Sequence, residues 1–195
     1  MQEKIEKRWR EYNKKLDEER IENIYDSLSN SIIRKTVSGE GVAAKNEIAL
    51  LRKNWNLDGL NIIEIGAGYG AYCKTMFEVA KPASYTIIDT KSMLRFSRAY
   101  LKEEEIPCTF IDTEDPLPDG NWDLLISNVC ISEIPEGHAK EMLSYLFKRV
   151  KKVAIIDVSI EWMFELLKDH FDTISKISCT ECNQVNHYLY TGKNE

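Results

Sequence analysis

From residue 61 onward, short apolar runs alternate with stretches of helical periodicity, and this alternation limits the possible folds more than any other feature. The apolar runs begin at Asn61 (NIIEI), Ser84 (SYTIID), Cys108 (CTFID), Asp123 (DLLISN) and Val153 (VAIID). Helical periodicity marks the stretches between and after them, near residues 71–80, 92–104, 137–149 and 160–170. Strands that are apolar on both faces and separated by helices predict a parallel sheet covered on both sides.

The C-terminal part follows a different pattern. DTISKIS from Asp172 and HYLYTG from His187 both alternate as strands do, and the segment between them is too short for a crossover helix. These two strands should therefore pair antiparallel. We expect an α/β fold with a Rossmann-like open sheet, mostly parallel with a C-terminal antiparallel strand.

The N-terminal segment predicts a helix within residues 2–28, because Ile5, Trp9, Tyr12 and Leu16 recur at spacings of four, three and four. Such a helix could be a solvated arm, a homodimer contact or a lid. VSGEG, at residues 37–41, interrupts the helical pattern. We therefore divide the 195 residues into an N-terminal helical arm over 1–40, which could include a lid, and one domain over 41–195.

Charge and composition exclude several classes of protein. The 26 basic and 32 acidic residues give a net charge of −6, which does not favour nucleic acid or an anionic membrane. The N-terminus is too charged for a secretory signal, and no apolar run approaches the ~20 residues of a membrane span. We expect a cytoplasmic protein with a small-molecule partner.

The cysteines predict free thiols and no metal site. Five cysteines are an odd number, and they are scattered along the chain, unlike a disulfide framework. Cys179, Cys182 and His187 begin a zinc-knuckle spacing, but Gly192 stands where the fourth ligand would be. A structural zinc ion needs four ligands, so we predict none here.

The stretch NIIEIGAGYGAY, residues 61–72, predicts a glycine-rich turn between the first strand and the first helix of the sheet. Glycines let the backbone approach a ligand in the crevice at the carboxyl ends of the strands. A dinucleotide would use Gly66, Gly68 and Ala71, with Asp89 on the ribose. S-adenosylmethionine is the other candidate, because Glu64 would attract its cationic end and repel a pyrophosphate.

EIGAGYG, followed by YTIIDT, FIDTEDPLPDGNWDLLISN and a terminal antiparallel strand, resembles the class I S-adenosylmethionine-dependent methyltransferases over about residues 41–192. The resemblance implies that Asp89 binds the ribose hydroxyls, that Asp112 and Thr113 contact the adenine, and that Ser127 and Asn128 lie beside the methionine. The full set of cofactor-binding residues that we predict is Glu64, Gly66, Ala67, Gly68, Tyr69, Gly70, Asp89, Thr90, Asp112, Thr113, Ser127 and Asn128.

A narrower resemblance is to a bacterial group of sugar O-methyltransferases. It rests on EIGAGYG, on Asp89 leading into a helix that contains Tyr100 and Leu101, and on Glu133 after the fourth strand. This resemblance implies a sugar or sugar-like hydroxyl as the methyl acceptor. The chain is short for the substrate-binding elements often found in such enzymes.

Methyl transfer to a hydroxyl needs a base that removes the acceptor's proton. Glu133 and His138 follow the fourth strand, on the rim where an acceptor would enter, and are the predicted catalytic residues. Asp157, at the end of the fifth strand, is a further candidate. Two other functions remain open: a catalytically weak S-adenosylmethionine-binding subunit that acts through its N-terminal helix, and a nicotinamide-binding Rossmann domain.

Overall fold

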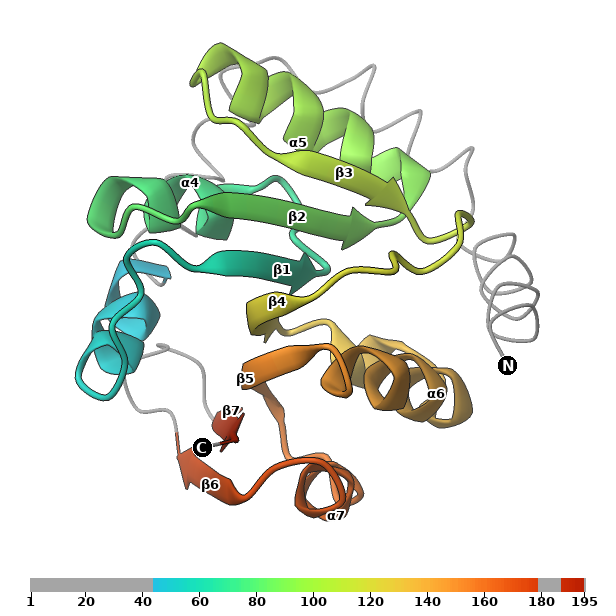
Figure 1. The fold of residues 1–195 in the computed structure, drawn as a ribbon. Helices are drawn as coiled ribbons and strands as arrows, with labels where there is room; N and C mark the ends of the chain where they lie inside the picture. The colour runs from blue at the N-terminus through green and yellow to red at the C-terminus, as the bar shows by residue number, and fades with distance from the viewer. Residues whose placement is uncertain (1–43, 179–186, 195) are drawn as a thin grey trace.

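The computed structural model describes residues 44–178 and 187–194. The predicted arm over 1–40, and both Cys179 and Cys182, lie outside these ranges. One seven-stranded sheet has the order β3-β2-β1-β4-β5-β7-β6, which Figure 1 shows from the top of the view to the bottom. Its strands are β1 (Asn61–Ile65), β2 (Ser84–Asp89), β3 (Thr109–Asp112), β4 (Trp122–Asn128), β5 (Val150–Val158), β6 (Thr173–Ser178) and β7 (His187–Lys193).

Helices cover both faces of this sheet. They are a helix over residues 44–52, α4 (Ala71–Val79), α5 (Lys91–Glu103), the short η1 (Ile131–Glu133), α6 (Glu136–Phe147) and α7 (Met163–Lys168). The helix over 44–52, α4 and α5 share one apolar core with one face of the sheet. The other face packs against α6 and α7. No helix in the described ranges has the length and apolar character of a membrane span.

The predicted sheet is confirmed. β1, β2, β3, β4 and β5 pair in parallel, and β7 runs antiparallel to both β5 and β6. The alternation of apolar runs with helical stretches predicted the parallel pairing. In the structure, helices lie between β1 and β2, between β2 and β3 and between β4 and β5, whereas residues 113–121 join β3 to β4 without a helix.

Two boundaries differ from the sequence-based expectation by more than two residues. β5 begins at Val150 and so includes two lysines, one of which, Lys151, forms an ion pair with Asp123 on β4 at 2.7 Å. α7 is shorter than predicted, because Ile160 is held before the helix: its N–H donates to the Tyr190 hydroxyl on β7 at 2.7 Å. In both places a contact between distant segments decides the boundary.

The carboxyl ends of four neighbouring parallel strands meet at one edge of the sheet. β1 ends at Ile65, β2 at Asp89, β3 at Asp112 and β4 at Asn128. Asp89 and Asp112 are direct partners in the register of β2 and β3. This edge therefore carries most of the side chains that the sequence predicts for a ligand site.

Candidate cofactor and active site

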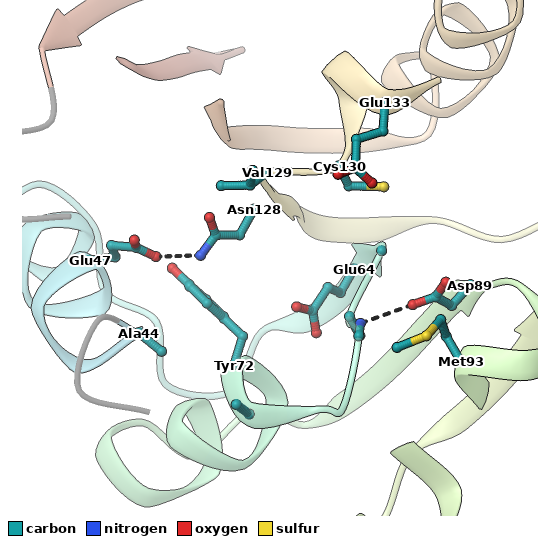
Figure 2. A pocket seen from close by; sticks show the side chains of 14 residues that line it. Ala44, Glu47, Glu64, Tyr72, Asp89, Met93, Asn128, Val129, Cys130 and Glu133 are labelled. Atoms are coloured by element: carbon teal, nitrogen blue, oxygen red, sulfur yellow. Dashed lines mark hydrogen bonds between the residues drawn. The ribbon is translucent and has the colours of Figure 1, made fainter. Parts of the chain in front are cut away.

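A cavity of about 390 Å³ opens at this edge of the sheet (Figure 2). Its walls come from the helix over 44–52, β1 and the turn after it, the end of β2, the start of α5, and the segment that follows β4. The fourteen lining residues are Ala44, Glu47, Glu64, Gly66, Ala67, Gly68, Ala71, Tyr72, Asp89, Met93, Asn128, Val129, Cys130 and Glu133.

The three glycines of the turn after β1 have different surroundings. All three have positive φ, at +73° for Gly66, +56° for Gly68 and +87° for Gly70. A Cβ on Gly66 would collide with the Sγ of Cys130, whereas one on Gly68 would meet nothing within 4 Å. Gly70 faces Leu101 of α5 and does not line the cavity. The space beside Gly68 is thus open to a ligand, whereas the missing side chain of Gly70 lets Leu101 of α5 pack closely.

Asp89 joins the end of β2 to this glycine turn. The Gly68 N–H donates to its Oδ2 at 2.9 Å, and the Thr90 N–H donates to its Oδ1 at 2.7 Å. Burial raises the pKa of Asp89 to about 7, and the charges of Asp112 and Glu133 raise it further against the lowering effect of the two hydrogen bonds. The carboxyl group is therefore oriented in advance, and none of the described residues that line the cavity with it is basic.

Glu64 lies deeper, on β1, with 1% of its surface exposed. The Tyr85 hydroxyl on β2 donates to its Oε2 at 2.8 Å. Burial raises the pKa of Glu64 to about 8, in spite of this hydrogen bond, and the nearby Asp89 adds to the increase. A cationic ligand group in the cavity would restore its charge.

Glu47 contributes a third buried carboxyl group, from the helix over 44–52. It is 2% exposed, and the Asn128 Nδ2 donates to its Oε2 at 2.7 Å. Burial raises the pKa of Glu47 to about 7. The Tyr72 ring, from the first turn of α4, points its hydroxyl toward this pair of side chains (Figure 2).

Of the predicted site residues, Glu64, Gly66, Ala67, Gly68, Asp89, Asn128 and Glu133 line the cavity. Asp112 and Thr113 lie next to it, because the Thr113 N–H donates to the Asp89 carbonyl at 3.0 Å. Thr90 caps α5 and accepts from the Met93 N–H. These residues lie together because they stand at or just after the carboxyl ends of neighbouring parallel strands.

Three other predicted residues have different contacts. The Tyr69 ring packs edge-on against Phe96, with centroids 5.4 Å apart. Ser127 is buried, and its hydroxyl donates to the Ile65 carbonyl at 3.0 Å, so it joins the ends of β1 and β4. His138, half-buried on α6, does not line the cavity. Asp157, the further candidate, is fully buried and accepts from the Ser132 N–H at 3.0 Å.

The sequence did not single out Glu47, Met93, Val129 or Cys130. Met93 could have been found from its place in the first turn of a helix that starts right after Asp89. Val129 has a φ of +49°, a conformation that β-branched residues rarely adopt, and it directly precedes Cys130. Backbone strain of this kind is common at binding sites, but it cannot be predicted from a sequence pattern.

All of the ionisable Asp, Glu, Lys, Arg or His side chains in the described lining of the cavity are acidic. Glu47, Glu64, Asp89 and Glu133 line it, and none of its fourteen described lining residues is Lys, Arg or His. The N-terminus of α4 also faces this space, since Ala71 and Tyr72 of its first turn are among the lining residues. The cavity therefore suits a ligand with cationic groups, with one place for an anion at the helix end.

Comparisons with solved structures identify proteins that have the same architecture. No protein-family model and no curated protein matches the sequence. Magnesium protoporphyrin IX methyltransferase from Synechocystis PCC 6803, with bound SAH (S-adenosylhomocysteine), aligns with a TM-score of 0.68 at 15% identity, over 98% of this chain and 100% of that chain. The chain has the class I methyltransferase fold.

Two further structures share this methyltransferase fold. An O-methyltransferase family protein from Burkholderia thailandensis aligns with a TM-score of 0.64 at 11% identity, over 84% of this chain and 60% of that chain. A candidate RNA methyltransferase from Pyrococcus horikoshii aligns with a TM-score of 0.63 at 13% identity, over 78% of this chain and 84% of that chain. Identities this low show the methyltransferase fold and not the acceptor.

Proposed function

We propose that this chain is an S-adenosylmethionine-dependent methyltransferase acting on a small molecule. The observation that carries the proposal is the charge of the cavity, with four carboxyl groups and no basic side chain among its described lining residues. S-adenosylmethionine brings a sulfonium and an ammonium group, whereas a nicotinamide dinucleotide brings a doubly charged pyrophosphate. Coulomb interactions are strengthened in a low-dielectric cavity, so this lining favours the sulfonium ligand.

The strand ends suggest how the cofactor would lie. Asp89 would accept the ribose hydroxyls, with Gly68 leaving room for the backbone approach. Asp112 and Thr113, beside Asp89, would contact the adenine. The methionine carboxylate would meet the N-terminus of α4, whose first backbone N–H groups have no partner within the helix. Tyr69, Gly70, Thr90 and Ser127 stay in the predicted set as residues that support this surface.

For the acceptor, we propose a hydroxyl group of a sugar or sugar-like metabolite, on the strength of the sequence resemblance. Glu133 is the proposed base, because it is exposed to solvent and also lines the cavity. It would take the proton from the hydroxyl as the oxygen attacks the methyl carbon and the carbon–sulfur bond breaks. His138 is the second candidate. The names of the fold neighbours point to a porphyrin and to RNA, so the fold does not support this choice.

Calorimetry with S-adenosylmethionine, S-adenosylhomocysteine and NAD tests the cofactor. We expect both sulfur nucleosides to bind and NAD to give no heat. Binding of NAD alone would overturn the proposal in favour of the nicotinamide-binding alternative.

Turnover is tested by the release of S-adenosylhomocysteine in the presence of fractionated cell metabolites. Glu133→Gln should lower the rate about 10²- to 10⁴-fold if Glu133 is the base. Glu136→Gln is the matched control, because Glu136 is exposed and pairs with Lys140 at 2.6 Å. Binding without turnover with any fraction would instead favour the cofactor-binding subunit.

We also propose that the enzyme is cytoplasmic and that it forms a homodimer through the helix predicted within residues 2–28. Light scattering of the full chain, compared with the chain from residue 41 onward, measures the contribution of that segment.

A further inference from the structure

A groove separate from the cofactor cavity lies at the edge of the sheet. α5 runs beside β3, the edge strand (Figure 1), and a groove of about 500 Å³ is lined by these two elements and by the segment that joins them. Ile106, Pro107 and Phe110 form its apolar lining, and the half-buried Cys108 stands among them. None of its described lining residues also lines the cofactor cavity. Its size suits a small molecule.

The charged side chains of the groove favour an anion. Arg98 and Lys102 line it from successive turns of α5, and the Arg98 guanidinium lies over the Phe110 ring, 5.2 Å from the ring centroid. Within the described residues, neither basic side chain forms an ion pair. Glu105 is the single acidic residue in the described lining, so the side chains other than Cys108 give the groove a net positive charge.

A second thiol contacts Cys108 from the core. The Cys73 thiol of α4 is fully buried and donates a hydrogen bond to the Cys108 sulfur, which lowers the pKa of Cys108 in spite of its partial burial. Burial raises the pKa of Cys73, so Cys73 stays protonated and remains a donor. Glu64 of β1 also acts on this pair, but its pKa of about 8 keeps it mostly protonated at neutral pH. Cys108 therefore presents a thiolate, the reactive form, to a positively charged groove.

We propose that Cys108 is a site of reversible modification by a small disulfide that carries carboxylate groups. Arg98 and Lys102 would bind the carboxylates of the incoming molecule. The Cys108 thiolate attacks one sulfur of the disulfide, the S–S bond breaks, and a new S–S bond joins Cys108 to the attacked half. The other half leaves as a thiolate, so it is reduced while Cys108 is oxidised. Attack by a free thiol reverses the step, and none of this depends on the proposed function.

Two disulfides of opposite charge test the groove. Glutathione disulfide is a net anion at neutral pH and cystamine is a cation, and both react through the same kind of S–S bond. Peptide mass spectrometry follows the adduct on Cys108 separately from the other four cysteines. The ratio of the two rates in the folded chain, divided by the same ratio in urea, measures what the fold contributes. We expect it to favour glutathione disulfide at least about twofold.

Substitutions on α5 locate the source of this preference. Arg98→Gln and Lys102→Gln should each lower the ratio about two- to fivefold. Lys91→Gln is the matched control, because Lys91 is an exposed residue of α5 outside the groove and the change in charge is the same. It should leave the ratio unchanged. Equal effects of all three substitutions, or no preference in the unaltered folded chain, would overturn the site.

Substitution of Cys73 tests its role as a positioning residue. Cys73→Ala removes the donor and should slow the reaction of Cys108 with both disulfides about threefold at neutral pH. Cys73→Ser keeps an O–H donor and should restore most of the rate, and urea unfolding compares the stability of the two variants. Equal rates for the two variants would overturn this role. So would a disulfide between Cys73 and Cys108 in place of the adduct, because Cys73 would then be a reactant.

Discussion

At the scale of single residues, Asp89 links the parts of the site. Its two oxygens hold the backbone of Gly68 and of Thr90, so the end of β2 orders both the glycine turn and the start of α5. The side chain is buried, with no basic side chain in the described lining of the cavity, and its carboxylate form is what the ribose hydroxyls would meet. Its role can therefore be measured without knowledge of the acceptor.

We expect Asp89→Asn to weaken S-adenosylhomocysteine about 10- to 100-fold, because an amide replaces one of the two oxygens that accept hydrogen bonds. Asp123→Asn, on β4 and away from the cavity, is the control; it loses an exposed contact to Lys151 and should bind normally. Calorimetry measures both. Equal affinities for the two variants would remove Asp89 from the site.

The open space at Gly68 gives a second test at this scale. Gly68→Ala puts a methyl group into the cavity and forces a non-glycine residue into positive φ, at a cost of roughly 1–2 kcal/mol. Gly59→Ala is matched, since Gly59 has a φ of +73° and equally open surroundings outside the cavity. Urea unfolding should show similar destabilisation for both. Only Gly68→Ala should lose affinity for the nucleoside.

At the scale of helices and strands, the sequence predicted the sheet and the strand-end residues, and it missed the contacts between distant segments. Asp89 and Asp112 could be predicted because parallel strands end at one edge, and the register pairs them. Glu47 could not be, because it reaches the site through Asn128, 81 positions further along the chain. Helical periodicity says which face of a helix is buried, but not what that face meets.

A hydrogen bond between Cys73 of α4 and Cys108, just before β3, shifts the pKa values of the two thiols in opposite directions. Cys108 precedes β3 and is half-buried in a groove with Arg98 and Lys102; a hydrogen bond from Cys73 lowers its pKa. Cys73, on α4, is fully buried, and burial raises its pKa. The thiolate is the reactive form.

Iodoacetamide at neutral pH should therefore alkylate Cys108 about tenfold or more faster than Cys73 in the folded protein. Peptide mass spectrometry over a time course measures both sites in one digest. The difference should vanish in urea, which serves as the control. Equal rates in the folded chain would mean that the two thiols are not arranged as described.

At the scale of the whole molecule, the cavity makes the empty protein sensitive to pH. Glu47, Glu64 and Asp89 have pKa values raised by burial to about 7, 8 and 7. The folded state therefore holds more protons than the unfolded state between their ordinary values near 4 and these raised values. Stability from these groups is present below about pH 4 and is lost as the pH rises toward 8.

We expect the free energy of unfolding to fall from pH 5 to pH 8, with each group contributing a slope of at most about 1.4 kcal/mol per pH unit. Urea titrations at several pH values measure it. Glu64→Gln should flatten the curve, and saturating S-adenosylhomocysteine should raise stability most at pH 8, where the carboxylates are ionised. A curve of Glu64→Gln as steep as that of the unaltered chain would contradict the assignment.

Val129 shows what this arrangement demands of the backbone. It lies in a left-handed turn between Asn128, which holds Glu47, and Cys130, which abuts Gly66. A β-branched residue in this conformation costs free energy that glycine or asparagine would save, so the thermal stability of the protein can be raised at this position. The same substitution would remove the constraint on the backbone that joins Asn128 to Cys130, so a more heat-resistant variant would hold the two sides of the pocket less firmly.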